Sequence, residues 1–279
     1  MISLFFVNMK NLNSVVKRIC GFRTGKAAIF AMMYCLFVAT AQAESGYVLQ
    51  RSLISGSHVG PDQIIGDATL LNRRAHPASL FKIVILVALL REGKLDSAER
   101  FEVEDHISTS PVDIRQATYR SSNKAFLELA RRLDARLLRE EAIRMRFFRA
   151  PPPASFGRSD SIYRGEDEKT DPLSIHRFMT RVAGEADLAK PEELHNFLLW
   201  PGSCLIAAKS DREIGRIHAK SGAWGGSAWM SGFCAGKRHK EVVTVFVPYE
   251  PPHWRPARER AIRLFYGAFQ ATVPDDVFY

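Results

Sequence analysis

The segment from Ala78 to Leu90 is apolar on every face of a helix except at two positions, Ser79 and Lys82. A helix with apolar residues all round is normally buried at the centre of a domain. Burial disfavours a charged lysine and lowers its pKa, and the neutral amine can act as a base. Because residues three apart share one face of a helix, we expect the Lys82 amine to lie beside the Ser79 hydroxyl. Such a pair is an activated serine nucleophile.

A structural role for the same pair is the alternative. Ser79 follows Pro77 at a predicted helix start, where it would cap the helix, and Lys82 would extend to the surface. Ordinary composition gives about one S-x-x-K match by chance in a chain of this length. The pattern therefore predicts chemistry only if other motifs accompany it.

Two such motifs follow in the sequence. S-S-N stands at Ser121–Asn123, at the start of a predicted helix, and K-S-G stands at Lys220–Gly222 on a predicted strand. Alone, the first would be a helix cap and the second a charge near a turn. Taken together, the chain carries S-x-x-K, S-x-N and K-S-G in that order.

This series resembles the motifs of the serine β-lactamases and penicillin-binding proteins, S-x-x-K, S-x-N and K-[ST]-G. Around Ser79, PASLFKI is closely similar to the PASTFKI of class D β-lactamases, and RSSNKAFLELARRL resembles the second-motif helix of transpeptidase domains. KTDPLSIHRFMTRVA resembles the helix after the active-site loop, and AWMSGFCA resembles the strand after the third motif. The resemblance extends from Pro77 to Val247.

The resemblance implies a catalytic role for four residues. Ser79 would attack a strained lactam or a D-alanyl amide to form an acyl-enzyme, with Lys82 as the base. Ser121 and Lys220 would relay the proton to the leaving nitrogen, a task that suits a hydroxyl beside a cationic amine.

The resemblance also implies a set of substrate-binding groups. Asn123 would hydrogen-bond the motif lysine and the amide side chain of the substrate. Ser221, in place of the commoner threonine, would contact the substrate carboxylate beside Gly222. The backbone N–H of Ala223, together with that of the nucleophile, would form the oxyanion hole.

A guanidinium usually assists carboxylate binding, because its planar fork matches that anion. Arg255 and Arg258 are the two candidates for this role. The alternative is that both are ordinary surface charges.

Three functions are compatible with these residues. A class D-like β-lactamase is preferred; the alternatives are a D,D-carboxypeptidase or transpeptidase of peptidoglycan, and a penicillin-binding sensor without turnover. The resemblance to class D enzymes implies that the motif lysine is carbamylated by carbon dioxide and acts as the base in that form. In this chain the polar Asn123 stands where class D enzymes usually have a small apolar residue, and this argues against carbamylation of Lys82. The deacylation motifs of classes A and C are missing, and Phe156-Gly157-Arg158 is a poor match to the Y-G-N of class D.

The elements that must position these residues change character along the chain. Two extended segments near the start form a predicted hairpin, helical patterns fill the middle, a long loop runs from Ala150 to Glu168, and a strand meander with a terminal helix ends the chain. The predicted strands are 46–52, 63–71, 216–221, 228–235 and 241–247, and the predicted helices are 78–90, 123–133, 136–148, 173–183, 192–199 and 256–265.

The predicted fold is of the α/β (α+β) class, a five-stranded antiparallel sheet flanked by helices with an inserted all-helical lobe. Residues 44–279 form a single catalytic unit: a sheet lobe from about 44–76 and 205–279, a helical lobe of about 92–200, and the central helix 78–90 between them. The 236 residues of this unit suffice for one large domain.

Residues 1–43 read as a secretory signal peptide, with five basic residues, no acid, an apolar run and a final A-Q-A. This predicts export to the periplasm without stable membrane insertion after cleavage. Five of the 39 basic residues leave with the leader, so the remainder carries 34 against 30 acids, in mixed-sign runs that do not suit nucleic-acid binding.

The remaining cysteines, Cys204 and Cys234, form one disulfide in an oxidising compartment or stay as two buried thiols. No histidine stands at a recognisable metal-ligand spacing, so we expect no metal and no cofactor. The expected partner is a small molecule, a β-lactam or a D-alanyl peptide, and the sequence leaves the oligomeric state open.

Overall fold

The structure is a computed structural model that describes residues 46–106, 111–157, 162–164, 168–208 and 212–278. The predicted leader at 1–43 lies outside these residues. At the centre is an antiparallel sheet with strand order β2-β1-β9-β8-β7-β6, in which β3 also pairs with β1. The strands are β1 (Val48–Ser55), β2 (His58–Val59), β3 (Gln63–Gly66), β6 (Leu199–Ala207), β7 (Arg212–Trp224), β8 (Ser227–Ala235) and β9 (His239–Pro248); β4 (Arg100–Phe101) pairs separately with β5 (Val112–Asp113).

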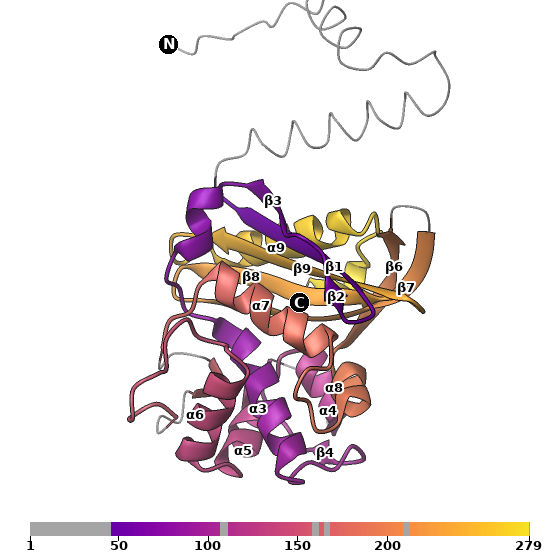
Figure 1. The fold of residues 1–279 in the computed structure, drawn as a ribbon. Coiled ribbons are helices and arrows are strands. Elements are labelled where there is room, and N and C mark those ends of the chain that lie inside the picture. The colour runs from indigo at the N-terminus through magenta and orange to yellow at the C-terminus, as the bar shows by residue number, and fades with distance from the viewer. Residues whose placement is uncertain (1–45, 107–110, 158–161, 165–167, 209–211, 279) are drawn as a thin grey trace, which may run out of the picture. The chain divides into compact units, whose positions relative to one another are not determined.

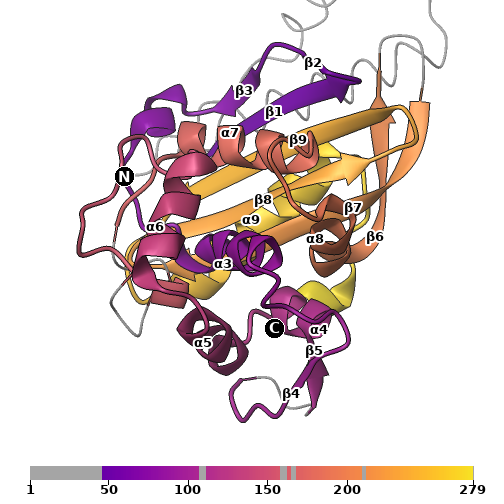
Figure 2. The ribbon, with the colours of Figure 1, turned by 60° about the horizontal axis from the view of Figure 1, so that its bottom comes forward.

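Helices cover both faces of the sheet (Figure 1). Helix α7 (Pro172–Ala183) packs on β1, β8 and β9 from the front, and helix α9 (Trp254–Ala268) packs on β7, β8 and β9 from behind. The other helices lie beside the sheet (Figure 2). They are α3 (Phe81–Arg91), α4 (Ile114–Tyr119), α5 (Asn123–Arg131), α6 (Ala135–Arg144) and α8 (Pro191–Phe197), and the short 3-10 helices are η1 (Ala68–Asn72), η2 (Ala78–Leu80), η3 (Ile162–Arg164) and η4 (Asp275–Val277).

The apolar segment forms the predicted central helix, as η2 followed directly by α3. Every residue from Phe81 to Leu90 is buried, including Lys82. The helix therefore has no solvent-facing side, which is why its sequence shows no amphipathic pattern. No helix in the described part of the chain is long and apolar enough to cross a membrane.

The fold class is confirmed, but the sheet has seven strands in the described residues and not the five expected. The additional edge strand β6 was not predicted, because Pro201 and Gly202 interrupt its pattern; its pairing with β7 shifts register between Leu199 and Ser203. The expected strand 63–71 ends at β3, since the Asp67 side chain accepts a hydrogen bond from Thr69 N and starts η1.

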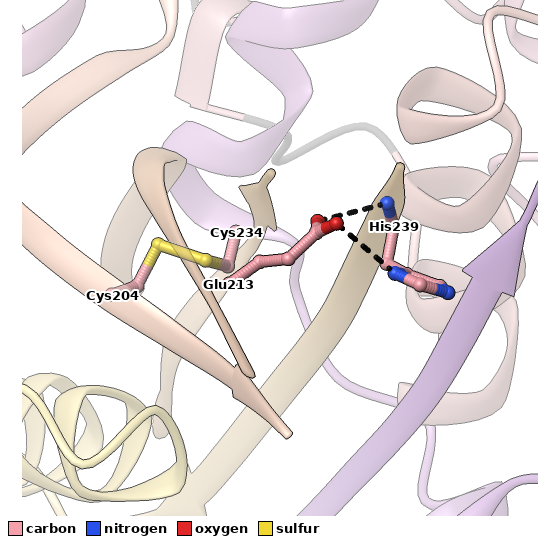
Figure 3. Close-up of a disulfide and its surroundings, with 4 residues drawn as sticks. All are labelled: Cys204, Glu213, Cys234 and His239. Atoms are coloured by element: carbon pink, nitrogen blue, oxygen red, sulfur yellow. Dashed lines mark hydrogen bonds and ion pairs between the residues drawn. A yellow bond between two sulfur atoms is a disulfide. The ribbon is translucent and has the colours of Figure 1, made fainter. Parts of the chain in front are cut away.

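Cys204 and Cys234 form a disulfide, which settles the alternative left open by the sequence (Figure 3). The bridge joins β6 to β8 across the intervening strand β7. It crosses at Gly215, where a Cβ would lie 2.8 Å from Cys234 Sγ, so only glycine leaves room for the sulfur. Nearby, the Glu213 carboxylate accepts hydrogen bonds from the backbone of Arg238 and His239 and fixes the turn between β8 and β9.

A buried polar group joins α7 to the sheet. His176 lies 2.6 Å from Ser52 Oγ and 3.2 Å from Thr244 Oγ1, through its two ring nitrogens. Burial lowers the pKa of His176 from its ordinary value to about 4, against the opposing attraction of Asp62. The folded protein therefore keeps this ring neutral at pH values where the unfolded chain takes up a proton.

We predict that His176 makes the fold acid-sensitive. As the pH falls from about 6.5 to 4, only the unfolded state gains the proton, so stability declines over that window by about 3 kcal/mol from this group. Urea denaturation at several pH values measures it. His176→Gln should flatten the decline, whereas the same change at the exposed His58 should not; equal slopes in all three proteins would contradict the prediction.

Candidate active site

The buried amine of Lys82 lies at the centre of the predicted site. Its Nζ donates to the carbonyl oxygens of Ser121 at 2.7 Å and Ser122 at 3.1 Å, and to Asn123 Oδ1 at 3.0 Å. Ser121 Oγ lies 3.1 Å away. Three predicted site residues from two motifs are thus in direct contact, and the surroundings of the amine are hydrogen-bond acceptors.

Two aromatic rings also lie close to this amine. The ring centroid of Phe126, on α5, is 5.0 Å from Lys82 Nζ, and that of Tyr163 is 5.7 Å away. Tyr163 belongs to η3, within the long loop predicted from Ala150 to Glu168. The described part of that loop therefore reaches the site, and no local pattern indicated Tyr163 as a site residue.

The second motif is held in place by a turn between α4 and α5. Ser121 has a left-handed backbone, with φ of 62°, and Ser122 caps α5 by accepting from Ala125 N at 3.1 Å. Such a conformation is uncommon outside glycine and persists only where the surroundings enforce it. Here it lets the carbonyl and the hydroxyl of Ser121 both face the lysine.

Asp105 is a positioning residue that sequence reasoning missed. Its Oδ2 accepts from Ser122 Oγ at 2.7 Å, from Asn123 N at 2.9 Å and from Lys124 N at 3.2 Å. A carboxylate on the first N–H groups of a helix is favoured by the helix dipole. The contact spans a long sequence separation, so no local pattern could have indicated it.

The nucleophile candidate Ser79 is half-buried on η2 and lies against β7. A Cβ built at Gly222 would be 2.8 Å from Ser79 N and 3.1 Å from Ala78 Cβ, so the third motif packs directly on the backbone of the first. Ala78 has a left-handed φ of 51° just before the serine. The segment is also tied down by Trp229, whose Nε1 donates to the carbonyl of His76 at 2.8 Å.

Lys220 is fully buried on β7. Burial lowers the pKa of Lys220 well below its ordinary value, and the charges of Lys82 and Arg258 lower it further. Its Nζ donates to the carbonyl of Ser221 at 2.8 Å; among the described residues no hydrogen bond joins it to Ser121. Lys220 is thus coupled electrostatically to Lys82 of the first motif and to Arg258, and its burial disfavours the charged form.

Of the two arginine candidates, Arg258 is the one at the site. Its guanidinium donates to Ser221 Oγ, with distances of 3.1 Å from Nη2 and 3.3 Å from Nε. Burial lowers the pKa of Arg258, because its charged form loses contact with water. A bound anion would compensate for that loss, so an anion at this position would be favoured. Arg255 is exposed and stacks on the ring of Trp254. Ala223, the predicted oxyanion-hole residue, follows Gly222 on β7 and is half-buried.

Solved structures with a similar fold include class D β-lactamases. The BAT-2 delta mutant, a class D β-lactamase, aligns with TM-score 0.64 and 13% identity over 85% of this chain and 97% of that chain. The BPu1 β-lactamase gives 0.63 and 12% over 82% and 96%. FUS-1 (OXA-85), a class D β-lactamase from Fusobacterium nucleatum subsp. polymorphum, gives 0.60 and 16% over 85% and 97%.

No family model and no curated protein sequence matches the chain. The structural likeness covers most of the chain at low sequence identity, so it speaks to the fold. The chain has the fold of the serine β-lactamase superfamily, and the resemblance predicted from the motifs is confirmed at that level.

We predict that Gly222→Ala destabilises the protein, because the added methyl group would have to push β7 away from Ser79. Overpacking of this kind costs about 1–3 kcal/mol. Urea denaturation measures the loss. Gly60→Ala is the control and should cost less, since the nearest atom to its Cβ, Leu53 O at 3.3 Å, is farther away than Ser79 N is at Gly222. An unchanged unfolding free energy in Gly222→Ala would show that the two motifs are less tightly packed than described.

Proposed function

We propose that this protein is a serine acyl-enzyme hydrolase that acts on β-lactams, a class D-like β-lactamase. The contact of Lys82 Nζ, on α3, with Ser121 Oγ and Asn123 Oδ1 carries the proposal. It joins the proposed base, which stands three residues after the proposed nucleophile Ser79, to the proposed proton-relay hydroxyl. The fold shared with solved class D β-lactamases supports it.

Acylation follows from the roles of these groups. Ser79 Oγ attacks the lactam carbonyl carbon while the Lys82 amine takes its proton, so a C–O bond forms and the carbonyl π electrons move to the oxygen. Breaking of the C–N bond then leaves an ester on Ser79, and the proton passes through Ser121 Oγ to the lactam nitrogen. The Lys82 amine is left neutral again.

Hydrolysis uses the same base a second time. The neutral Lys82 amine takes a proton from water as the water oxygen attacks the ester carbonyl, and the proton returns to Ser79 Oγ when the ester C–O bond breaks. The products are the free serine and an opened, carboxylate-bearing lactam. No further group is needed to balance the proton.

Binding of the substrate carboxylate is assigned to the third motif. Ser221 Oγ and the Arg258 guanidinium lie together, and the buried amine of Lys220 donates to the carbonyl of Ser221 beside them. The backbone N–H groups of Ser79 and Ala223 are proposed to bind the oxyanion. Fixed donors and charges of this kind stabilise the transition state without reorganisation.

We also propose that Lys82 stays unmodified. Two carbonyl oxygens and Asn123 Oδ1 face its Nζ, and these acceptors suit an amine or ammonium but would repel a carbamate anion. The same observation favours a second candidate, a D,D-carboxypeptidase or transpeptidase that β-lactams acylate without rapid release.

The proposed location is the periplasm. Support comes from the basic and apolar leader at 1–43 and from the Cys204–Cys234 disulfide, since such bonds persist in oxidising compartments. The partner is a small-molecule substrate.

Ser79→Ala should abolish covalent labelling by a penicillin, because the change removes only the attacking hydroxyl. Intact-mass spectrometry of the purified protein after incubation with the penicillin is the measurement. Ser203→Ala, on the exposed surface of β6, is the matched control and should label like the wild type. Labelling of the Ser79 variant at the wild-type rate would refute the assignment of the nucleophile.

The time course of the adduct distinguishes the two candidates. After a single dose of penicillin, we expect the mass of the acyl-enzyme to rise and then disappear at a rate that added bicarbonate does not change. An adduct that persists would favour the alternatives without rapid release, the peptidase and the penicillin-binding sensor. Faster clearance in bicarbonate would show that Lys82 is carbamylated, against the proposal that it is unmodified.

A further inference from the structure

A pocket of about 300 Å³ lies at the start of α9, outside the three motifs. Its lining joins two guanidinium groups and one carboxylate to two aromatic rings. The lining residues are Trp254, Arg255, Arg258, Glu259 and Phe278.

Arg258 makes this pocket a neighbour of the proposed carboxylate site. The same guanidinium lines the pocket and donates to Ser221 Oγ. An anion held by Ser221 and Arg258 would therefore lie next to the pocket. A substituent next to that anion would extend into it.

Another part of the lining, formed by Phe278, is connected to α4, the helix that precedes the second motif. Tyr119, two residues before Ser121, donates its hydroxyl to the carbonyl of Asp276 at 3.0 Å and so holds η4 against α4. Phe278 follows η4, and its ring is stacked under the guanidinium of Arg263, 4.5 Å from the centroid. This part of the lining is therefore positioned from both α4 and α9.

The chemistry of the lining selects flat, acidic groups. Two arginines face one carboxylate, Glu259, so the lining carries an excess of positive charge. The indole of Trp254 is 39% exposed and already has the guanidinium of Arg255 over its ring at 5.2 Å. A planar anion fits between such groups by stacking on the rings and pairing with the guanidinium.

Resting on the proposed function, we propose that this pocket is a specificity subsite for a flat, negatively charged substituent adjacent to the substrate carboxylate. In the cephalosporin nucleus, the ring carbon beside the carboxylate-bearing carbon carries the variable leaving group. With the carboxylate on Ser221 and Arg258, that group enters the pocket. The subsite thus favours cephalosporins whose substituent at this position is an acidic heteroaromatic ring.

The test uses three cephalosporins with one acyl side chain and, beside the carboxylate, an anionic heteroaromatic ring, a methyl group or a cationic ring. The second-order acylation rate of each is measured by intact mass. Because substituents also change ring reactivity, the readout is the rate ratio of the anionic to the methyl compound in each protein. Arg255→Gln should lower this ratio about fivefold, the upper range for an exposed ion pair.

Phe278→Ala should lower the ratio as well, and should leave the preference for anionic over cationic rings in place. Arg216→Gln, which removes the same charge from an exposed position on β7, should keep the wild-type ratio. Equal ratios in the wild type and Arg255→Gln would overturn the subsite while leaving the proposed function standing. Failure of all three compounds and of penicillin to acylate the wild type would instead overturn the proposed function, and the subsite with it.

Discussion

The burial of one lysine amine inside an apolar helix is the constraint on which the site depends. Removing a cation or an amine from water costs several kcal/mol unless hydrogen-bond acceptors replace the water. Lys82 has no exposed surface, and the turn at Ser121–Asn123 supplies these acceptors. The chain thereby couples the first motif to the second, because the buried amine is hydrogen-bonded by the turn.

The third motif is coupled to the first by packing. Gly222 leaves no space between β7 and the backbone of Ser79, and the disulfide clamps the strands on either side of β7 at Gly215. Two residues with left-handed backbone, Ala78 and Ser121, lie next to Ser79 and in the turn of the second motif. Strained backbone of this kind persists where tertiary contacts enforce it, and it collects at functional sites.

The sequence predicts the parts of this arrangement that depend on local pattern. An all-apolar run indicated the buried helix, because a helix without a polar face has no side for solvent, whereas the shared face of Ser79 and Lys82 stays a prediction. The fold class followed from the change from helical to strand patterns. Strand β6 was missed since Pro201 and Gly202 break the alternation on which a strand prediction rests.

Contacts between segments distant in the sequence could not be predicted. Elements must pack before Asp105 can contact the first residues of α5 or Tyr163 can lie beside the amine. Packing also decides that Arg258, and not Arg255, reaches the site. The disulfide likewise required the geometry of three adjacent strands. The fold, the motif contacts and the electrostatics together support a single chemical account, in which one amine serves both acylation and hydrolysis.

The acylation rate of Lys82→Met tests that account most directly. Methionine fills the same space without a base, and thermal unfolding confirms that the variant is folded. The account predicts that the second-order rate of penicillin acylation at Ser79 falls by about 10³-fold, within the range for loss of a general base. A rate within about threefold of the wild type would show that another group takes the proton and that the lysine is structural.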